Sequence, residues 1–177
     1  MSGILPRLIE CAEKAKLTHV VIGGLALPAY NVVRASYDVD FCIAVKDQDE
    51  LDNFLSILNK NGIKTQQRPR SDDIIFTVYD QELKQEAEIW LTPCDKFRWD
   101  DQMVSRIRRS EKGFNVLSPE DYVVAKLARA DRSAVDVDDV MQIIEMQRDR
   151  IDMQYLKKRA EWAGVSNDLK NLLKKLD

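Results

Sequence analysis

Residues 20–45, VVIGGLALPAYNVVRASYDVDFCIAV, constrain the fold more than any other stretch. An apolar run is closed by Gly23 and Gly24, a short segment with helical spacing follows, and an alternating strand then carries Asp38 and Asp40. Because side chains two apart on a strand leave the same face, the two carboxylates are predicted to lie side by side. Like charges about 4 Å apart repel by about 4 kcal/mol at an effective dielectric of about 20, so such a pair is expected to take up a proton or bind a metal ion.

Length and composition indicate a single globular domain. The chain has 177 residues, of which 45% are hydrophobic and 32% are charged, and a disordered chain would be less apolar. A net charge of −3 gives no general attraction to nucleic acid, so any contact with RNA would need a local basic patch.

The location of the protein is predicted by elimination. Three widely spaced cysteines, Cys11, Cys42 and Cys94, form no CxxC pair, which is typical of a reducing compartment. Residues 1–16 are interrupted by Pro6 and Arg7 and lack the apolar region of a signal peptide, and no run approaches the length that spans a membrane. We therefore expect a cytoplasmic protein with no membrane partner.

Periodicity and capping residues predict an α/β core followed by helices. Helices are expected over residues 4–16, 25–33, 47–59, 100–106, 118–130, 134–148, 153–163 and 166–176, and strands over residues 19–22, 38–45, 63–68, 74–80 and 86–92. The clearest helix start is Ser118, with Pro119 in the first turn and Asp121 completing a capping box. The predicted fold class is α+β with an α/β core, in which a mixed sheet is flanked by helices. Residues 1–115 are expected to form the core and residues 116–177 a helical segment packed on it, in one compact domain.

The polar residues of this core form a combined motif. It consists of Gly23 and Gly24, then Arg34, Ser36, Asp38 and Asp40 in the pattern R-x-S-x-D-h-D, and finally Glu88 in a later strand. The motif resembles the polymerase-β-like nucleotidyltransferase superfamily, and most of all its minimal AbiEii-type and MNT-type members from toxin–antitoxin systems. The segment LSPEDYVVAKLARADRSAVDVDDV resembles a downstream part of that family and adds Lys126 and Asp136 as candidates. The resemblance covers residues 17–140 approximately and implies the nucleotidyltransferase fold.

The resemblance implies a metal-dependent active site. Asp38, Asp40 and Glu88 would be the catalytic residues and would hold two Mg²⁺ ions against the triphosphate of an NTP substrate. Glu88 would also assist deprotonation of the attacking hydroxyl. The family more often has Asp at this third position, and Glu86 competes for the role, but the apolar run after Glu88 matches the family better.

Nucleotide-binding residues are also implied. Gly23 and Gly24 would offer backbone N–H groups to the phosphates. Arg34 and Ser36 would steady those phosphates, and Lys126 could reach them as a point charge or could be a helix lysine with its charge in solvent.

The resulting hypothesis is an enzyme that moves an NMP unit from an NTP to a hydroxyl of an RNA or tRNA end or of a protein. The subtype further implies a toxin with a cognate antitoxin, and oligomerisation is left open. The alternative is a nucleotidyltransferase-fold interaction protein with little or no catalysis that binds a cognate partner. A small-molecule acceptor is a third option, disfavoured because no separate substrate domain is evident.

Overall fold

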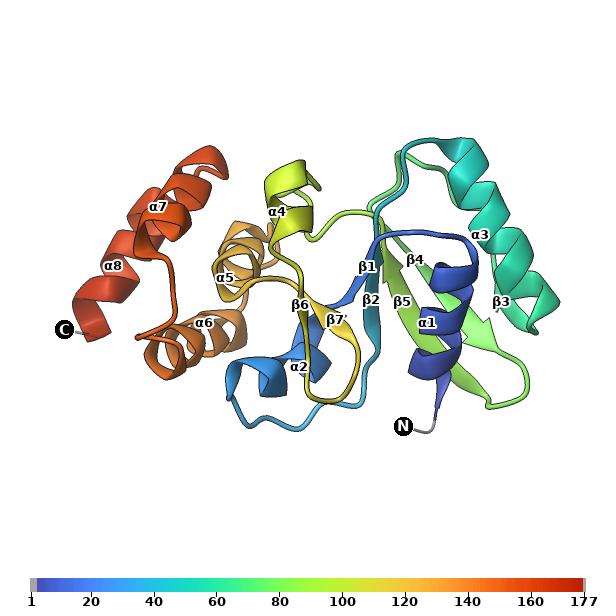
Figure 1. The fold of residues 1–177 in the computed structure, drawn as a ribbon, viewed down its shortest axis with the longest axis horizontal. Coiled ribbons are helices and arrows are strands. Elements are labelled where there is room, and N and C mark those ends of the chain that lie inside the picture. The colour runs from blue at the N-terminus through green and yellow to red at the C-terminus, as the bar shows by residue number, and fades with distance from the viewer. Residues whose placement is uncertain (1–2, 177) are drawn as a thin grey trace.

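Short segments of the chain pair into one mixed sheet, shown in Figure 1 in the computed structural model, which describes residues 3–176. The strands are β1 (His19–Val21), β2 (Asp40–Ile43), β3 (Ile63–Thr65), β4 (Ile75–Asp80), β5 (Gln85–Trp90), β6 (Arg108–Arg109) and β7 (Asn115–Val116). Their order across the sheet is β3-β4-β5-β2-β1-β7-β6. The helices are α1 (Ile4–Lys14), α2 (Gly23–Ala26), the 3-10 helix η1 (Leu27–Tyr30), α3 (Gln48–Lys60), α4 (Asp101–Ser105), α5 (Pro119–Ala128), α6 (Ala134–Met146), α7 (Met153–Trp162) and α8 (Ser166–Leu176).

The middle of the sheet is β2, which runs antiparallel to β1 and parallel to β5. β4 is antiparallel to β5, and β7 is parallel to β1. This mixed sheet with flanking helices confirms the predicted α+β class. The register of the parallel pair sets Asp40 opposite Glu88, so the sheet itself brings two acids from distant parts of the chain together.

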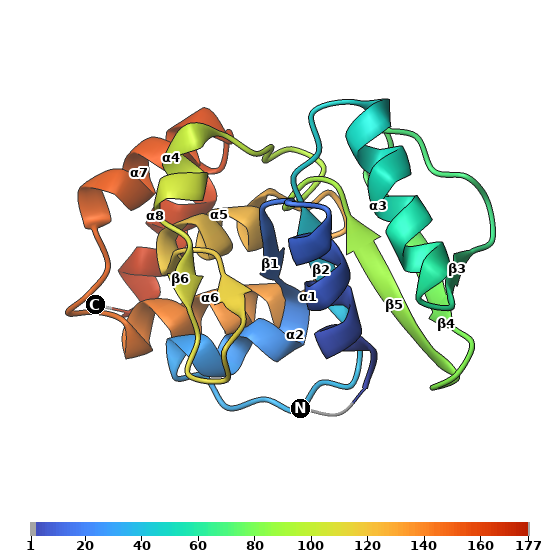
Figure 2. The ribbon, with the colours of Figure 1, turned by 45° about the vertical axis from the view of Figure 1, so that its right-hand side comes forward.

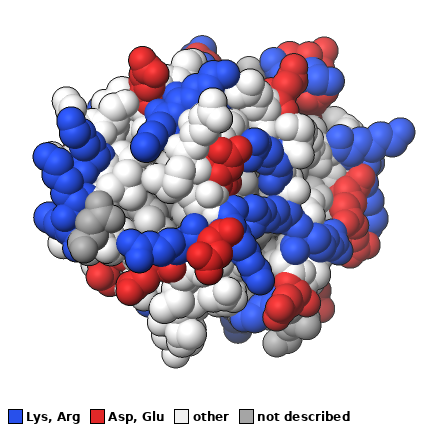
Figure 3. All heavy atoms as spheres, turned by 60° about the vertical axis from the view of Figure 1, so that its left-hand side comes forward, with Lys and Arg blue, Asp and Glu red and all other residues white. Residues whose placement is uncertain are grey.

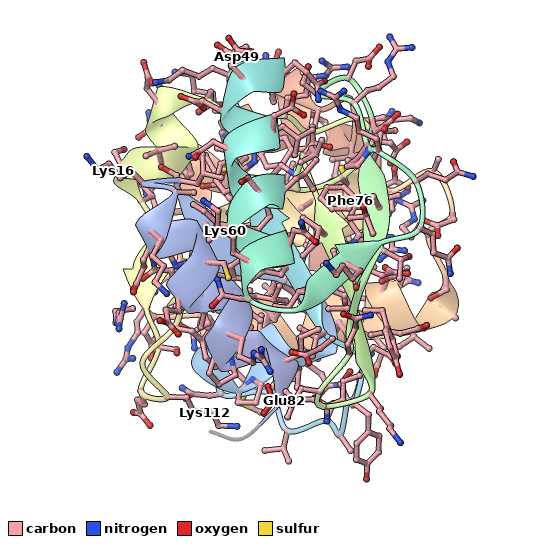
Figure 4. All side chains as sticks on the ribbon, turned by 90° about the vertical axis from the view of Figure 1, so that its right-hand side faces the viewer. Lys16, Asp49, Lys60, Phe76, Glu82 and Lys112 are labelled. Carbon is pink, nitrogen blue, oxygen red and sulfur yellow. The ribbon has the colours of Figure 1, made fainter. Side chains whose placement is uncertain are left out.

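One face of the sheet is covered by α1 and α3, which lie side by side in Figure 4. Each helix has an apolar stripe at helical spacing that faces the sheet. The buried residues of these stripes include Leu8 of α1 and Phe54 and Leu58 of α3. In Figure 2, α1 lies in front of β2 and α3 runs beside β3. Asp47 begins α3 as predicted, since its side chain accepts a hydrogen bond from the Glu50 backbone.

The helices α5 to α8 gather at the opposite end of the molecule from β3 (Figure 1). All residues of α5 are buried, and Ser118 caps it by accepting a hydrogen bond from the Asp121 backbone. The complete capping box lies instead at the start of α6, where Ser133 and Asp136 each bond the other's backbone N–H. None of the helices in residues 3–176 combines the length and apolar character that crossing a bilayer requires.

The structure corrects two predicted elements near the glycines. The helix expected over residues 25–33 begins at the glycines as α2 and η1, and it ends where Asn31 adopts a left-handed conformation with φ 65°. The strand expected over residues 38–45 spans only β2, so Asp38 precedes it. The reason lies on the β1 side, where the Ile22 N–H donates to the Asp40 carbonyl and the chain after Ile22 turns into α2. On the other side, the Val39 carbonyl still accepts a hydrogen bond from the Glu88 N–H at 2.9 Å.

A buried ionic network fixes α7 against α5 and α4. The Arg159 Nε donates to Asp121 at 2.9 Å and its Nη1 donates to Asp100 at 2.6 Å. The side chain of Asp121 is 0% exposed and that of Arg159 is 6% exposed. The Tyr155 hydroxyl also donates to Asp121 at 3.1 Å. Removal of the arginine would therefore leave a buried carboxylate without its cation.

We predict that Arg159→Met lowers the free energy of unfolding by about 3–5 kcal/mol, because Asp121 would stay buried without a cation. Urea unfolding measures the loss. The matched control is Lys158→Met, which changes the exposed neighbouring residue and is expected to stay within about 0.5 kcal/mol of the wild type. Equal losses in the two variants would contradict the importance of the network.

Candidate active site

The glycine pair is required by the close approach of the chain that follows it. Gly23 has φ +61°, and a methyl group there would overlap the Asp40 carboxylate. A methyl group on Gly24 would overlap Ser36, with the Arg34 guanidinium close by. The Gly23 carbonyl also accepts a hydrogen bond from the Tyr122 hydroxyl of α5 at 2.6 Å. The glycine turn is thus held between β2, the loop that precedes β2, and α5.

Two of the predicted acids meet next to this turn. Asp40 and Glu88 are register partners on the parallel strands β2 and β5. Partial burial raises the pKa of the Glu88 carboxyl, and the neighbouring Asp40 carboxylate raises it further. Two carboxylates that interact in this way lower the cost of binding a cation between them.

Asp38 lies before the first residue of β2, so the prediction that Asp38 and Asp40 belong to the same strand is wrong. The exposed Asp38 lines a cavity of 710 Å³ at the start of β2 and β5, together with Ser36, Tyr79 and Glu86. Neither Asp40 nor Glu88 lines that cavity. The two glutamates of β5 therefore lie in different surroundings, and Glu88 is the one that faces Asp40.

The donor set can be compared with what Mg²⁺ requires. Among the residues that the structure describes, no three His, Cys, Asp or Glu side chains are grouped closely enough to hold a metal ion by themselves. Mg²⁺ in nucleotide sites is usually bound by one or two carboxylates plus substrate phosphates. Asp40 and Glu88 supply such a pair, so the site fits Mg²⁺ that arrives with a nucleotide.

An ionic cluster of α5, α6 and the loop before β2 lies next to the glycine turn, where the Arg34 guanidinium approaches Gly24. The Arg34 Nη1 donates to both carboxylate oxygens of Asp139, at 3.0 and 2.9 Å. The Lys126 Nζ donates to Asp136 at 2.8 Å and to Asp139 at 3.0 Å. Asp139 is 0% exposed, while Arg34 is 35% exposed. Lys126 is thus a buried, paired cation rather than one that extends into solvent, and Arg34 is the cation that reaches the surface.

Sequence reasoning missed the roles of three residues in this region: the hydrogen bond of Tyr122, the position of Arg129 and the ion pairs of Asp139. The spacing of Asp136 and Asp139 was a signal for Asp139, because residues three apart lie on one face of a helix. Arg129 follows the last residue of α5, its Cζ lies 5.5 Å from the centroid of the Trp90 ring, and its charge offsets a small part of the rise in the pKa of Glu88. Its positive charge therefore acts on the carboxylate pair.

This sheet, with a glycine turn against one strand and acids on two neighbouring strands, is the nucleotidyltransferase fold. A family model described as "Nucleotidyl transferase of unknown function (DUF2204)" matches residues 4–177. The chain belongs to this family, so it is a nucleotidyltransferase that uses an NTP and an acceptor. The predicted superfamily is confirmed.

Two solved structures of one protein are similar in fold. The solution structure of the antibiotic-resistance factor ANT(2'')-Ia is 12% identical, with a TM-score of 0.55, over 98% of this chain and 92% of that chain. The crystal structure of ANT(2'')-Ia in complex with adenylyl-2''-tobramycin is also 12% identical, with a TM-score of 0.56, over 91% of this chain and 95% of that chain. The comparison with curated proteins gave no match. At such identities the likeness shows the fold alone.

The glycine geometry leads to a stability prediction. Gly62→Ala is expected to cost about 1–2 kcal/mol, because Gly62 has φ +75° but open space around it. Gly23→Ala is expected to lower the free energy of unfolding by about 1–3 kcal/mol more than Gly62→Ala does, because its methyl group also displaces the Asp40 carboxylate. Urea unfolding of both variants compares the two losses. If Gly23→Ala is no less stable than Gly62→Ala, the position of the Asp40 carboxylate does not require a glycine at residue 23.

Proposed function

We propose that the protein transfers an NMP unit from an NTP to a hydroxyl acceptor in a Mg²⁺-dependent reaction. The observation that carries this proposal is the register that sets Asp40 opposite Glu88, beside the glycine turn. The turn offers bare backbone for phosphates, and the acids offer oxygen ligands for the cation that accompanies them.

Asp40 and Glu88 would hold Mg²⁺, and Asp38 is proposed as the third ligand because of its place in the R-x-S-x-D-h-D motif. When bound, two Mg²⁺ ions would neutralise the triphosphate charge and orient the α-phosphate. Glu88 would also accept the proton of the attacking hydroxyl.

The phosphates would contact the backbone N–H groups of Gly23 and Gly24, with Ser36 beside them. Arg34 lies on the surface side of the ionic cluster, and Asp139 holds its guanidinium in place. Its positive charge would attract the phosphates. Lys126 is proposed to act within that cluster, because two carboxylates already bind its ammonium group.

The acceptor is proposed from the resemblance to AbiEii-type and MNT-type proteins. On that basis it is an RNA or tRNA end or a protein hydroxyl, and the protein is a cytoplasmic toxin with a cognate antitoxin. The other acceptor class is a small molecule, since the solved structure similar in fold carries adenylyl-2''-tobramycin. We further propose residues 1–115 as the core that carries the site and residues 116–177 as the helical segment that supports it.

Transfer of label from α-labelled NTPs to cell extract, in the presence of Mg²⁺, tests the proposal. We expect Asp38→Asn, Asp40→Asn and Glu88→Gln each to lower the rate by about 100-fold or more, because each removes a charge that stabilises the transition state. Glu86→Gln is the matched comparison on the same strand and should retain most of the rate. A larger loss in Glu86→Gln than in Glu88→Gln would contradict the assignment of the glutamates.

Calorimetry tests nucleotide binding without knowledge of the acceptor. We expect NTP binding that requires Mg²⁺ and is weakened by Asp40→Asn. The control is Asp138→Asn, at an exposed acid of α6, which should bind NTP as the wild type does. A complete lack of Mg²⁺-dependent NTP binding would instead favour the interaction protein with little catalysis.

A further inference from the structure

A groove with lysines along its rim lies between α7 and α8, at the end of the molecule that Figure 3 turns toward the viewer. Its volume is 600 Å³. Lys157, Lys158, Lys170 and Lys174 form the rim, and Leu169 and Leu173 lie at the floor. We call this feature the lysine groove. It is separate from the proposed active site, because it shares no residue with the glycine turn or the acids.

The lysine groove carries more positive than negative charge, because four lysines and a single acid, Glu161, are among the described residues that line it. All four rim lysines are exposed, and in the part of the chain described none of them forms an ion pair. Residues 153–176 contain six basic and two acidic side chains, although the whole chain has a net charge of −3. Figure 3 shows basic side chains over much of this end. A concentrated positive charge on an acidic protein attracts an anionic partner.

The floor of the lysine groove selects between anionic partners. Leu173 is half-buried, and the aliphatic stems of the lysines extend the apolar surface beside it. Proteins that hold single-stranded nucleic acid stack its bases on aromatic side chains, and phosphate sites favour the fork of arginine. Among residues 3–176, no aromatic side chain and no arginine lines the groove. An apolar floor between two helices instead matches the way a groove receives the apolar face of an amphipathic helix.

We propose that the lysine groove binds an acidic amphipathic helix of a partner protein. Leucine-type residues on one face of that helix contact Leu173, and Asp or Glu residues on either side of this face meet the four rim lysines. Glu161 of α7 also lines the groove, so it would repel an acidic residue of the partner helix placed next to it. The interaction depends on the C-terminal helices and is independent of the proposed transfer reaction.

Amide chemical shifts of the ¹⁵N-labelled protein test the proposal directly. The probe is a synthetic helical peptide of about 15 residues with Leu at i, i+3 and i+4 spacing and Glu on both sides. The comparison probes are the same peptide with Lys for Glu and a single-stranded RNA of equal negative charge. We expect the acidic peptide alone to shift amides, and these amides to lie in α7 and α8.

Two charge-reversed variants separate the lysine groove from general electrostatics. The first variant should weaken peptide binding about tenfold or more, because like charges would then face each other. It combines Lys157→Glu, Lys158→Glu, Lys170→Glu and Lys174→Glu. The control combines Lys46→Glu, Lys60→Glu, Lys64→Glu and Lys96→Glu, which changes the net charge equally at exposed sites elsewhere and should bind as the wild type does. The half-buried floor residue is tested by Leu173→Ser, which should weaken binding while the melting temperature confirms folding.

Three results would overturn the proposal. The first is the lack of any shift with the acidic peptide at millimolar concentration. The second is tighter binding of the RNA than of the peptide to the same amides. The third is an equal loss of binding in the control variant, which would show attraction by net charge alone.

Discussion

The packing of the Asp40 side chain against Gly23 is the contact on which the rest of the site depends. The Asp40 carbonyl accepts a hydrogen bond from the Ile22 N–H, its carboxylate occupies the space that a side chain at residue 23 would fill, and its register partner on β5 is Glu88. One residue therefore joins the first strand, the glycine turn and the second acid. Because core strands cannot slip by one residue without turning their apolar side chains to solvent, the register that pairs the acids is as firmly fixed as the core itself.

A buried carboxylate plays the corresponding role for the cations. Asp139 binds both Arg34 and Lys126, and so it connects the loop before β2 with α5 and α6. A buried carboxylate is costly unless it is paired, so this cluster keeps its members in one arrangement. The helices after residue 116 thus contribute to the site although they carry none of the paired acids.

Sequence patterns predicted what depends on local chemistry. The caps at Asp47 and Ser118 and the apolar stripes of α1 and α3 follow from side chains close together in the chain, and they lie where expected. Glu88 was preferred over Glu86 by the apolar run after it, and β5 sets Glu88 opposite Asp40. The roles of these acids in binding and catalysis stay predictions.

The features that the sequence could not reveal depend on the length and position of neighbouring strands and helices. The alternation D-V-D-F suits a strand from Asp38 onward, but β1 turns into α2 and leaves Asp38 without a partner on that side. The pairing of Lys126 with Asp136 and Asp139 depends on how α5 and α6 pack, which the sequence of either helix does not reveal. The left-handed Asn31 similarly ends η1 earlier than its apolar residues suggest.

The central claim is that Asp40 and Glu88 together bind the cation that accompanies a nucleotide. A crystal structure with Mn²⁺ and a non-hydrolysable NTP analogue tests it most directly, because anomalous scattering locates the metal. The account predicts Mn²⁺ bonded to carboxylate oxygens of both Asp40 and Glu88, with phosphate oxygens beside Gly23. Mn²⁺ bonded in the cavity of Asp38 and Glu86 alone, or a nucleotide bound away from the glycine turn, would contradict it.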